Sequence, residues 1–369
     1  MKRVVGLIAS LTLLAAACAG DVATTTAPDG VASPTVAAGP QGTTPSLPGT
    51  LRLLTHDSFL VSDEVFAAFT AETGISVEVI PAGDTGIMVN QAVLTAGNPF
   101  ADVLYGIDNT FLSRALDANL FVPHESPGLA TVPAALQIES GHHVTPIDYG
   151  DVCVNFDKAA FTTMPAPGTL GDLADPRYAG MLVVENPATS SPGLAFLLAT
   201  IAAFPESAPY TWRDFWRDLR ANDVLVTSGW EEAYYGGFSG GSGEGDRPLV
   251  VSYASSPPVE VIFSETPLDE APTGVLTAGC FRQIEFAGIL RGTPREEAAR
   301  LLIDFMLSER FQEDIPLNMF VFPANADADL PPEFVEHTTA PTDPATLDPA
   351  LIEAERERWI DEWTSIVLR

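Results

Sequence analysis

The residues best suited to chemistry lie in a glycine-rich stretch that reads GFSGG at Gly237–Gly241. This spelling matches the nucleophile elbow of hydrolases, in which a serine sits on a tight turn between a strand and a helix. Ser239 is followed by GGSGEGDRP, whose glycines and proline cannot begin a stable helix. No Gly-Lys-Ser/Thr triplet closes the stretch, so it is not a phosphate-binding P-loop. We expect a flexible loop insertion here, with a secreted serine hydrolase as the alternative from another functional class.

The histidines offer two further candidates for chemistry. His56 and Asp57 follow a strand-like segment, and an isolated pair of this kind is more often a hydrogen-bonded structural pair than a catalytic one. His142 and His143 have no third ligand at a suitable spacing, which favours a solvent-facing loop over a metal site. The sequence therefore predicts neither a catalytic residue nor a bound metal.

The charge balance excludes a nucleic-acid partner. The chain has 369 residues, of which 49 are acidic and 18 are basic, and its formal net charge is -31. Such a surface repels polyanions and attracts cations, although a solvated acidic surface without a function is the other explanation. The length and the hydrophobic content of 46% are those of a chain with two globular units.

The N-terminus has the form of a secretion signal. Lys2 and Arg3 precede an apolar run from Val4 to Ala17 that is too short to span a bilayer. The small residues before Cys18 resemble a bacterial lipobox, so we predict a signal peptide over residues 1–17 and lipidation of Cys18; ordinary signal cleavage is the alternative. Residues 18–49 are rich in Thr, Ala, Pro and Gly, which predicts a flexible tether. We expect an extracytoplasmic protein anchored to the membrane.

Two cysteines remain once Cys18 is set aside. Cys153 and Cys280 both lie in strand-like stretches, DVCVNF and GCFRQIEF. In an exported protein they could form a disulfide between neighbouring strands, or stay as two buried thiols.

From Leu51 onward, strand-like and helix-like segments alternate. Helical patterns over residues 62–74 and 87–96 lie between the strand-like segments LRLLTHDS, ISVEVIPAG and ADVLYGID. This order predicts a mainly parallel sheet with helices on both faces. A second alternation starts near Ile147, includes a strand over 281–287 and ends with helices over 293–307 and about 349–368. Two α/β units of this kind predict a ligand cleft between them, at the carboxyl ends of the strands.

The loops after these strands resemble, in order, those of the periplasmic thiamine-binding proteins of ABC transporters, a branch of the type II substrate-binding proteins. The similar stretches cover nearly all of residues 51–369 and include LTHDSF, ADVLYGIDNTFL, IDYGDVCVNFDK, ATSSPGLAFLL, VTSGWEEAYY, LVVSYASSP, FQEDIPLNMFVFPAN and WIDEWTSIVLR. The resemblance implies a bilobed α/β fold of the periplasmic-binding-protein type II class, with two α/β lobes joined by hinge strands. We place lobe 1 at residues 51–147 and 283–320, lobe 2 at 148–282, and a C-terminal segment that packs on the lobes at 321–369.

Thiamine carries a permanent positive charge and a flat aminopyrimidine, so its site needs aromatic faces and a neutralising carboxylate. The resemblance implies that Asp84 is the binding aspartate and that Ser190 lies near the hydroxyl or phosphate end of the ligand. There, Gly193 begins a helix whose N–H groups could accept an anion. The further ligand-binding candidates are Trp230, Tyr253, Phe320, His56, Asp57, Ser191 and Tyr234. For Trp230, a place in the core of a lobe is the alternative.

Three positions depart from the family pattern. His56 stands where the family has a tyrosine, Val259 replaces another aromatic residue of the pocket, and Phe320 replaces a tryptophan. Phe offers a weaker cation-binding face than Trp, so the choice among thiamine, its phosphates and a related cation stays open. Tyr234 or Tyr235 could compensate for the lost rings. The same tyrosine pair resembles the ferric-ion-binding relatives of this superfamily, which makes iron the main rival ligand.

Together these observations predict a receptor without catalytic activity or cofactor. We expect it to close two lobes around thiamine or a thiamine phosphate, as a monomer, and to deliver the ligand to an ABC permease.

Overall fold

One mixed sheet organises residues 49–369, the part of the chain that the computed structural model describes. The predicted signal peptide (residues 1–17), the lipidation site Cys18 and the tether (residues 18–49) lie outside this part, except that Gly49 belongs to the first strand. Within it, ten strands pair in the order β2-β1-β3-β9-β5-β8-β6-β7, with β4 on β9 and β10 on β5. Their bounds are β1 Gly49–Thr55, β2 Ile75–Pro81, β3 Val103–Asp108, β4 Phe121–Val122, β5 Thr145–Asp157, β6 Leu182–Glu185, β7 Leu225–Thr227, β8 Leu249–Tyr253, β9 Thr273–Leu290 and β10 Phe322–Pro323.

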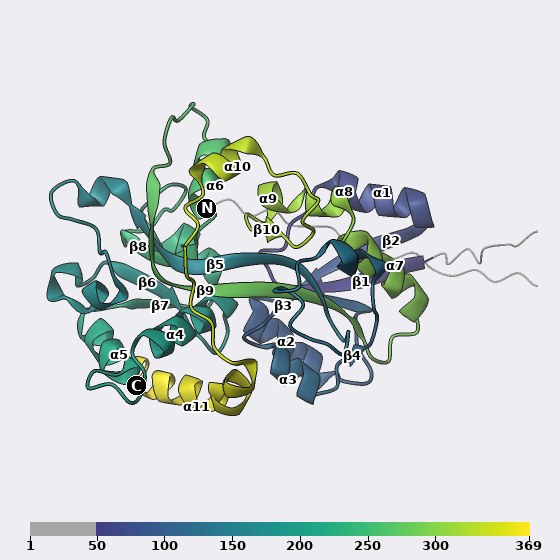
Figure 1. Ribbon diagram of the computed structural model, residues 1–369, viewed down its shortest axis with the longest axis horizontal. Helices are drawn as coiled ribbons and strands as arrows, with labels where there is room; N and C mark the ends of the chain where they lie inside the picture. The colour runs from purple at the N-terminus through teal and green to yellow at the C-terminus, as the bar shows by residue number, and fades with distance from the viewer. Residues whose placement is uncertain (1–48) are drawn as a thin grey trace, which may run out of the picture. The chain divides into compact units, whose positions relative to one another are not determined.

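Helices connect the strands and lie on both sides of them. Figure 1 shows α2, α3, α4, α5 and α11 below the central strands β5 and β9, and α1, α6, α8, α9 and α10 above them. The α-helices are α1 Asp63–Thr73, α2 Thr85–Leu94, α3 Leu112–Asp117, α4 Ser191–Ala203, α5 Trp212–Ala221, α6 Ser256–Ile262, α7 Glu296–Met306, α8 Glu309–Gln312, α9 Ile315–Asn318, α10 Pro332–His337 and α11 Pro349–Val367. None of the helices of residues 49–369 is long and apolar enough to cross a bilayer.

The local predictions for strands and helices are largely confirmed. Helix α1 ends at Gly74, which adopts the left-handed conformation (φ 74°) that stops a helix. The apolar residues of α5 repeat at helical spacing and are all buried: Trp212, Phe215, Trp216 and Leu219. The strand predicted over 281–287 is longer than expected, because β9 begins at Thr273 and pairs along its length with β5.

The two longest strands, β5 and β9, join the two halves of the sheet (Figure 1). In the first half, β1 lies parallel to β2 and β3, and β3 pairs with the C-terminal part of β9. In the second half, β6 lies parallel to β7 and β8, and β8 pairs with the C-terminal part of β5. The predicted lobe boundaries at 147/148 and 282/283 fall inside these two strands, and the division into lobes stays a prediction.

A disulfide ties β5 to β9 in the second half. The structure joins Cys153 to Cys280, with an S–S distance of 2.02 Å and a Cα–Cα distance of 4.3 Å. The β5–β9 register shifts between Val152 and Val154, and Gly279 of β9 has a φ of 88°, which favours glycine. The extra residues in β9 form a bulge at the position of the disulfide.

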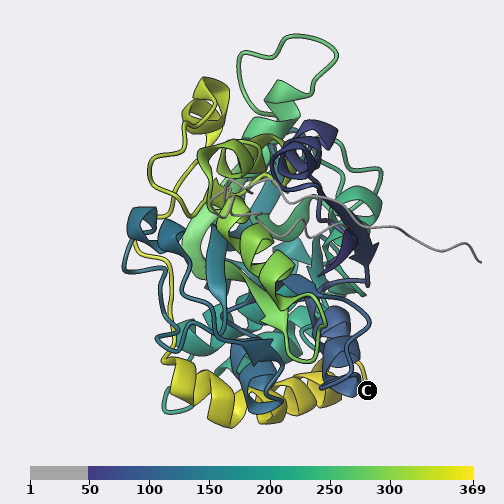
Figure 2. The same cartoon turned by 90° about the vertical axis from the view of Figure 1, so that its right-hand side faces the viewer.

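Helix α11 packs against both halves of the sheet. Figures 1 and 2 show it at the bottom of the molecule, opposite α10. At one end, the buried Arg356 donates to Ser113 Oγ of α3 at 2.9 Å. Near the other end, the buried Trp363 packs edge-on against Trp216 of α5, with ring centroids 5.4 Å apart. The C-terminal segment therefore packs on elements of both halves.

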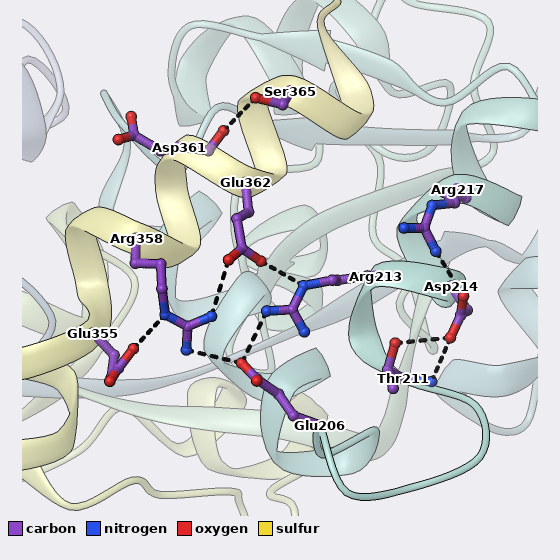
Figure 3. Close-up of polar contacts among 10 residues, drawn as sticks. All are labelled: Glu206, Thr211, Arg213, Asp214, Arg217, Glu355, Arg358, Asp361, Glu362 and Ser365. Carbon is purple, nitrogen blue, oxygen red and sulfur yellow. Dashed lines mark hydrogen bonds and ion pairs between the residues drawn. The ribbon is translucent and has the colours of Figure 1, made fainter.

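Salt bridges surround the contact between α11 and α5. Figure 3 shows Arg213 and Arg358 sharing two carboxylates, Glu206 and Glu362. Arg213 reaches Glu362 at 2.5 Å and Glu206 at 3.1 Å, and Arg358 reaches the same two residues at 3.0 and 2.9 Å. These side chains are partly exposed, so each pair adds little by itself, and the buried Trp363–Trp216 contact forms the apolar part of the same interface.

The disulfide should contribute to stability because it closes a long loop in the unfolded chain, with a sequence separation of 127 residues. We expect the Cys153→Ala/Cys280→Ala double variant to lose roughly 2 to 5 kcal/mol of unfolding free energy. Urea titration followed by circular dichroism measures this difference. A reducing agent should lower the midpoint of the wild type and leave that of the double variant unchanged; equal midpoints for the oxidised and reduced wild type would contradict the contribution.

Candidate functional site

A cavity of about 310 Å³ opens where the two halves of the sheet meet. Its lining comes from the loops after β1, β6, β7 and β8, from the start of α2, from β9 and from the loop before β10. Such a volume is at the lower end of those that hold small-molecule ligands. The lining residues are His56, Asp57, Ser58, Phe59, Leu60, Asp84, Thr85, Ser191, Pro192, Trp230, Glu231, Tyr235, Tyr253, Ser256, Glu285, Asn318, Met319, Phe320 and Val321.

Seven of the nine predicted ligand-binding residues line this cavity: His56, Asp57, Asp84, Ser191, Trp230, Tyr253 and Phe320. The other two lie behind it. Ser190 is fully buried and caps α4, where its hydroxyl accepts from Gly193 N at 3.4 Å, so this N–H group already has an acceptor. Tyr234 is also buried, and its hydroxyl donates to Glu260 at 2.8 Å.

The carboxylate of Asp84 is held by backbone N–H groups from both halves. It caps α2 by accepting from Thr85 N at 2.6 Å, and it also accepts from Ser191 N at 3.2 Å and Trp230 N at 3.1 Å. Burial raises the pKa of Asp84, and the hydrogen bonds to the charged form oppose this. The carboxylate therefore takes the place that an external anion would occupy at these helix starts.

Two glycines allow this close contact between the halves. A Cβ at Gly86 would lie 2.7 Å from the carbonyl oxygen of Ala188, and one at Gly229 would lie 3.0 Å from Asp84 Oδ2. Gly86 N also donates to Thr189 O at 3.0 Å. Larger side chains at either position would push α2 away from the loops of the second half.

Trp230 forms an aromatic wall of the cavity. One face of its ring stacks on Tyr234 at 5.1 Å and 20°, and its Nε1 donates to Ser252 Oγ at 2.9 Å. Tyr235 packs edge-on against it at 5.5 Å and is itself part of the lining. Because its hydrogen bond and its backing ring fix Trp230 in place, the ring is a preorganised platform for a flat ligand.

The segment that carries these rings is more regular than the flexible loop we expected. Residues Glu232–Gly237 form a π-helix, and Ser239 N then donates to Arg247 O at 2.9 Å. Ser239 Oγ donates to Asp157 at 2.9 Å, and the chain continues into a turn rather than a helix. The GFSGG stretch therefore lacks the strand–turn–helix context of a nucleophile elbow.

Phe320 also lines the cavity, and its backbone conformation is unusual. Its φ of 60° is rare for a bulky residue without glycine's freedom, and its carbonyl accepts from Ser255 Oγ at 2.7 Å. A second hollow of about 510 Å³ adjoins the cavity and shares Leu60, Tyr235, Asn318 and Phe320 with it. Val259 lines this second hollow, so the position where the family has an aromatic residue still borders the site.

His56 faces Glu285 of β9 rather than Asp57. Its Nε2 lies 3.6 Å from Glu285 Oε2, and its ring is 6.0 Å from that of Tyr105. Gly106, with a φ of 94°, makes room for it, because a Cβ there would lie 2.2 Å from His56 Cδ2. Burial lowers the pKa of His56, although nearby carboxylates oppose this, so the ring tends to be neutral.

Sequence reasoning missed Glu285 and its neighbour Gln283. Gln283 Nε2 donates to Ser191 Oγ at 3.1 Å and to Glu285 at 3.2 Å, and Gln283 accepts from the Tyr253 hydroxyl at 3.0 Å. The only sequence signal is a charged residue between apolar ones in QIEFAG, which an exposed strand face explains equally well.

The lining is acidic. It contains Asp57, Asp84, Glu231 and Glu285, and neither Lys nor Arg occurs among the lining residues of the described chain. With His56 tending to be neutral, the cavity favours a positively charged ligand over a negatively charged one.

The tyrosine pair does not face the cavity as a pair. Tyr234 lies behind the lining with its hydroxyl bonded to Glu260, and Tyr235 alone of the two lines the cavity. Burial raises the pKa values of both hydroxyls. Over residues 49–369, no group of three or more His, Cys, Asp or Glu side chains has the geometry to hold a metal ion. His142 and His143 lie in a half-buried loop, where His143 contacts Glu139 at 3.3 Å.

Comparisons with known proteins agree with this fold. The thiamine-binding periplasmic protein of Salmonella typhimurium is 30% identical over 326 residues, which cover 86% of this chain and 94% of the relative. A solved structure described as a periplasmic thiamin binding protein is 27% identical, with a TM-score of 0.76 over 89% of this chain and 99% of that one. Iron uptake protein A1 of Synechocystis sp. is 26% identical over 342 residues, covering 86% and 88% of the two chains.

These relatives are named as binding or uptake proteins, not as enzymes. The structural similarity confirms the predicted α/β fold of the type II periplasmic binding proteins. Residues 98–342 match the family described as bacterial extracellular solute-binding protein. Because this match and the similarity to the Salmonella protein together span most of the described chain, the protein belongs to the bacterial extracellular solute-binding proteins.

Proposed function

We propose that this protein is the extracytoplasmic receptor for thiamine and that it delivers the vitamin to an ABC permease. The observation that carries the proposal is the cavity, which combines the aromatic rings of Trp230, Tyr235, Tyr253 and Phe320 with an acidic lining. A flat cation gains from both features, because ring faces attract positive charge and carboxyl groups neutralise it. The thiamine-binding relatives support the choice of this cation.

The lining favours free thiamine over its phosphates. A phosphate would meet the acidic residues of the cavity without a Lys or Arg among the lining residues of the described chain. The N–H groups of Thr85, Ser191 and Trp230 already donate to the Asp84 carboxylate. We therefore infer that the ester group of a thiamine phosphate would have to displace Asp84 or remain in the outer hollow.

Anchoring and assembly form the finer part of the proposal. Lipidation of Cys18 would hold the receptor at the outer face of the cytoplasmic membrane, and residues 18–48 would act as the tether between the lipid and the folded part. We propose a monomer that closes by a hinge motion through β5 and β9, because these strands join the two halves.

Native mass spectrometry of the protein purified from its host tests the ligand directly. We expect a bound mass equal to that of thiamine, because a tight receptor retains its ligand through purification. A mass equal to that of iron would contradict the proposal, and a mass equal to that of a thiamine phosphate would contradict the preference for the free vitamin.

Replacing the aromatic wall should weaken binding. We expect Trp230→Ala to reduce the binding free energy for thiamine by about 1 to 2 kcal/mol, since it removes the preorganised cation-binding face. Isothermal titration calorimetry measures the loss, and Tyr210→Ala, an exposed ring outside the cavity, is the matched control. Equal affinity of Trp230→Ala and the wild type would remove this ring from the site.

Asp84 should act mainly through the contact between the halves. In Asp84→Asn the amide nitrogen cannot accept, so at least one N–H group loses its partner, and we expect roughly 1 to 3 kcal/mol lower stability. Binding of thiamine and of an uncharged analogue should weaken to a similar extent. A loss confined to the cation, at unchanged melting temperature, would show instead that Asp84 is a free counter-ion.

A further inference from the structure

Three acidic side chains lie side by side beneath the cavity, on neighbouring strands. Glu285 of β9 is directly paired with Asp108 of β3 on one side and with Asp148 of β5 on the other. Directly paired residues project to the same face of a sheet, with Cβ atoms about 5 Å apart. All three are buried, and in the described part of the chain no Lys or Arg forms a salt bridge with any of them. We call Asp108, Glu285 and Asp148 the acidic row.

The three carboxyl groups differ in the hydrogen bonds that they receive. Asp108 accepts from the hydroxyls of Ser191 and Thr110 and from the N–H groups of Thr110 and Phe111, a set that stabilises a charged carboxylate. Asp148 accepts from the Tyr105 hydroxyl, and its second oxygen is buried without a hydrogen-bond partner. Glu285 accepts from Gln283, and its second oxygen faces His56 at 3.6 Å, beyond hydrogen-bonding distance. A proton shared with the Asp148 carboxyl lowers the pKa of Glu285, but it does not cancel the effect of burial.

The row cannot carry three negative charges without compensation. Burial raises the pKa of Asp108, of Asp148 and, to about 8, of Glu285, and the charge on Asp108 adds to the effect on Glu285. His56 offers no opposing charge because burial lowers its pKa, and its Nε2 is buried without a hydrogen-bond partner. The titratable groups that surround Glu285 from the adjoining elements are His56, Asp84, Tyr105, Asp108, Asp148 and Tyr253. None of them is a cation when His56 is neutral.

Only one member of the row is open to a ligand. Glu285 lines the cavity, whereas Asp108 and Asp148 do not. Asp84 also lines it, but three backbone N–H groups already balance its charge. The other two carboxyl groups of the lining, Asp57 and Glu231, belong to residues that are exposed to solvent. Glu285 is therefore the buried carboxyl group of the lining whose charge the protein leaves unbalanced.

We propose, resting on the thiamine-binding role above, that Glu285 is the counter-ion for the positive ring of the ligand and that ligand entry displaces a proton from it. In the empty receptor the carboxyl group holds a proton. When the cation enters, the O–H bond of the carboxyl breaks, the proton passes to a solvent base, and the carboxylate pairs with the ring. Charge balances at each stage, because one bound proton is exchanged for one bound cation.

The proposal fixes the sign of the pH dependence. Below a pH of about 8, binding must expel the proton of Glu285, so affinity falls as the pH falls. Above that pH the carboxyl is already ionised, and affinity no longer changes with pH through this group. Roughly nine-tenths of the empty receptor is protonated at Glu285 one unit below its pKa, so nearly one proton is released for each thiamine bound near pH 7.

Calorimetry of the whole receptor with thiamine measures this release. The binding enthalpy is recorded at pH 7 in buffers of different ionisation enthalpy, and the slope of one against the other gives the number of protons released. We expect a release of about one proton at pH 7 and a smaller one at pH 8.5. If thiamine binds with no release at pH 7, the proposal is overturned while the thiamine-binding function stands. If thiamine does not bind at all, the proposed function itself fails.

The Glu285→Gln variant identifies the group. Glutamine has the shape of the protonated acid, so the variant should fold and should melt no lower than the wild type. We expect it to release no proton and to bind thiamine roughly 10- to 100-fold more weakly, with an affinity that no longer depends on pH between 6.5 and 8.5. Glu72→Gln makes the same change on the exposed face of α1 and should keep the wild-type release. A full proton release from Glu285→Gln would assign the proton to another group and overturn the proposal.

Discussion

The compensation of buried negative charge is the constraint on which this site depends. A carboxylate in a low-dielectric interior is costly unless hydrogen bonds, opposite charges or protons balance it. Asp84 is balanced by N–H groups from Thr85, Ser191 and Trp230, which belong to segments on both sides of the cavity. The same contact therefore stabilises the charge and holds the two halves at the distance that creates the cavity.

The acidic row meets the same constraint in a different way. Asp108 receives several hydrogen bonds, but Asp148 and Glu285 receive too few to offset the desolvation free energy of a buried carboxylate. A positively charged ligand is the missing compensation for the one member that reaches the cavity. The buried carboxyl groups therefore have two roles: Asp84 and Asp108 stabilise the structure through their hydrogen bonds, and Glu285 is the member of the row that a ligand can reach.

The aromatic lining and the departures from the family pattern fit this electrostatic design. Trp230 stacks on Tyr234, which holds its ring in a fixed position for the ligand. Phe320 binds a cation more weakly than a tryptophan would, so Trp230 is the stronger of these two cation-binding faces. His56 lies next to Glu285 and, unlike a tyrosine, becomes a cation when it takes up a proton. Selectivity for a cation then depends on the balance of protons among these groups as well as on the rings.

Local sequence patterns determined most of the elements, because helical and strand periodicities depend on neighbouring residues. The helical pattern over residues 62–74 predicted a helix there, and α1 at Asp63–Thr73 confirms it. The family resemblance also pointed to residues that line the cavity, including Asp84 and Trp230.

The tertiary structure alone decided which of these residues reach the ligand and which are already occupied. Tyr234 and Ser190 lie behind the lining. Tyr234 stacks on the ring of Trp230, and Ser190 caps α4. Glu285 acquires its importance from strand register, which places it between Asp108 and Asp148, residues that are more than a hundred positions away in the chain. Sequence determines local conformation through short-range sterics and hydrogen bonding, whereas the charge state of a buried group is set by distant neighbours that only folding brings together.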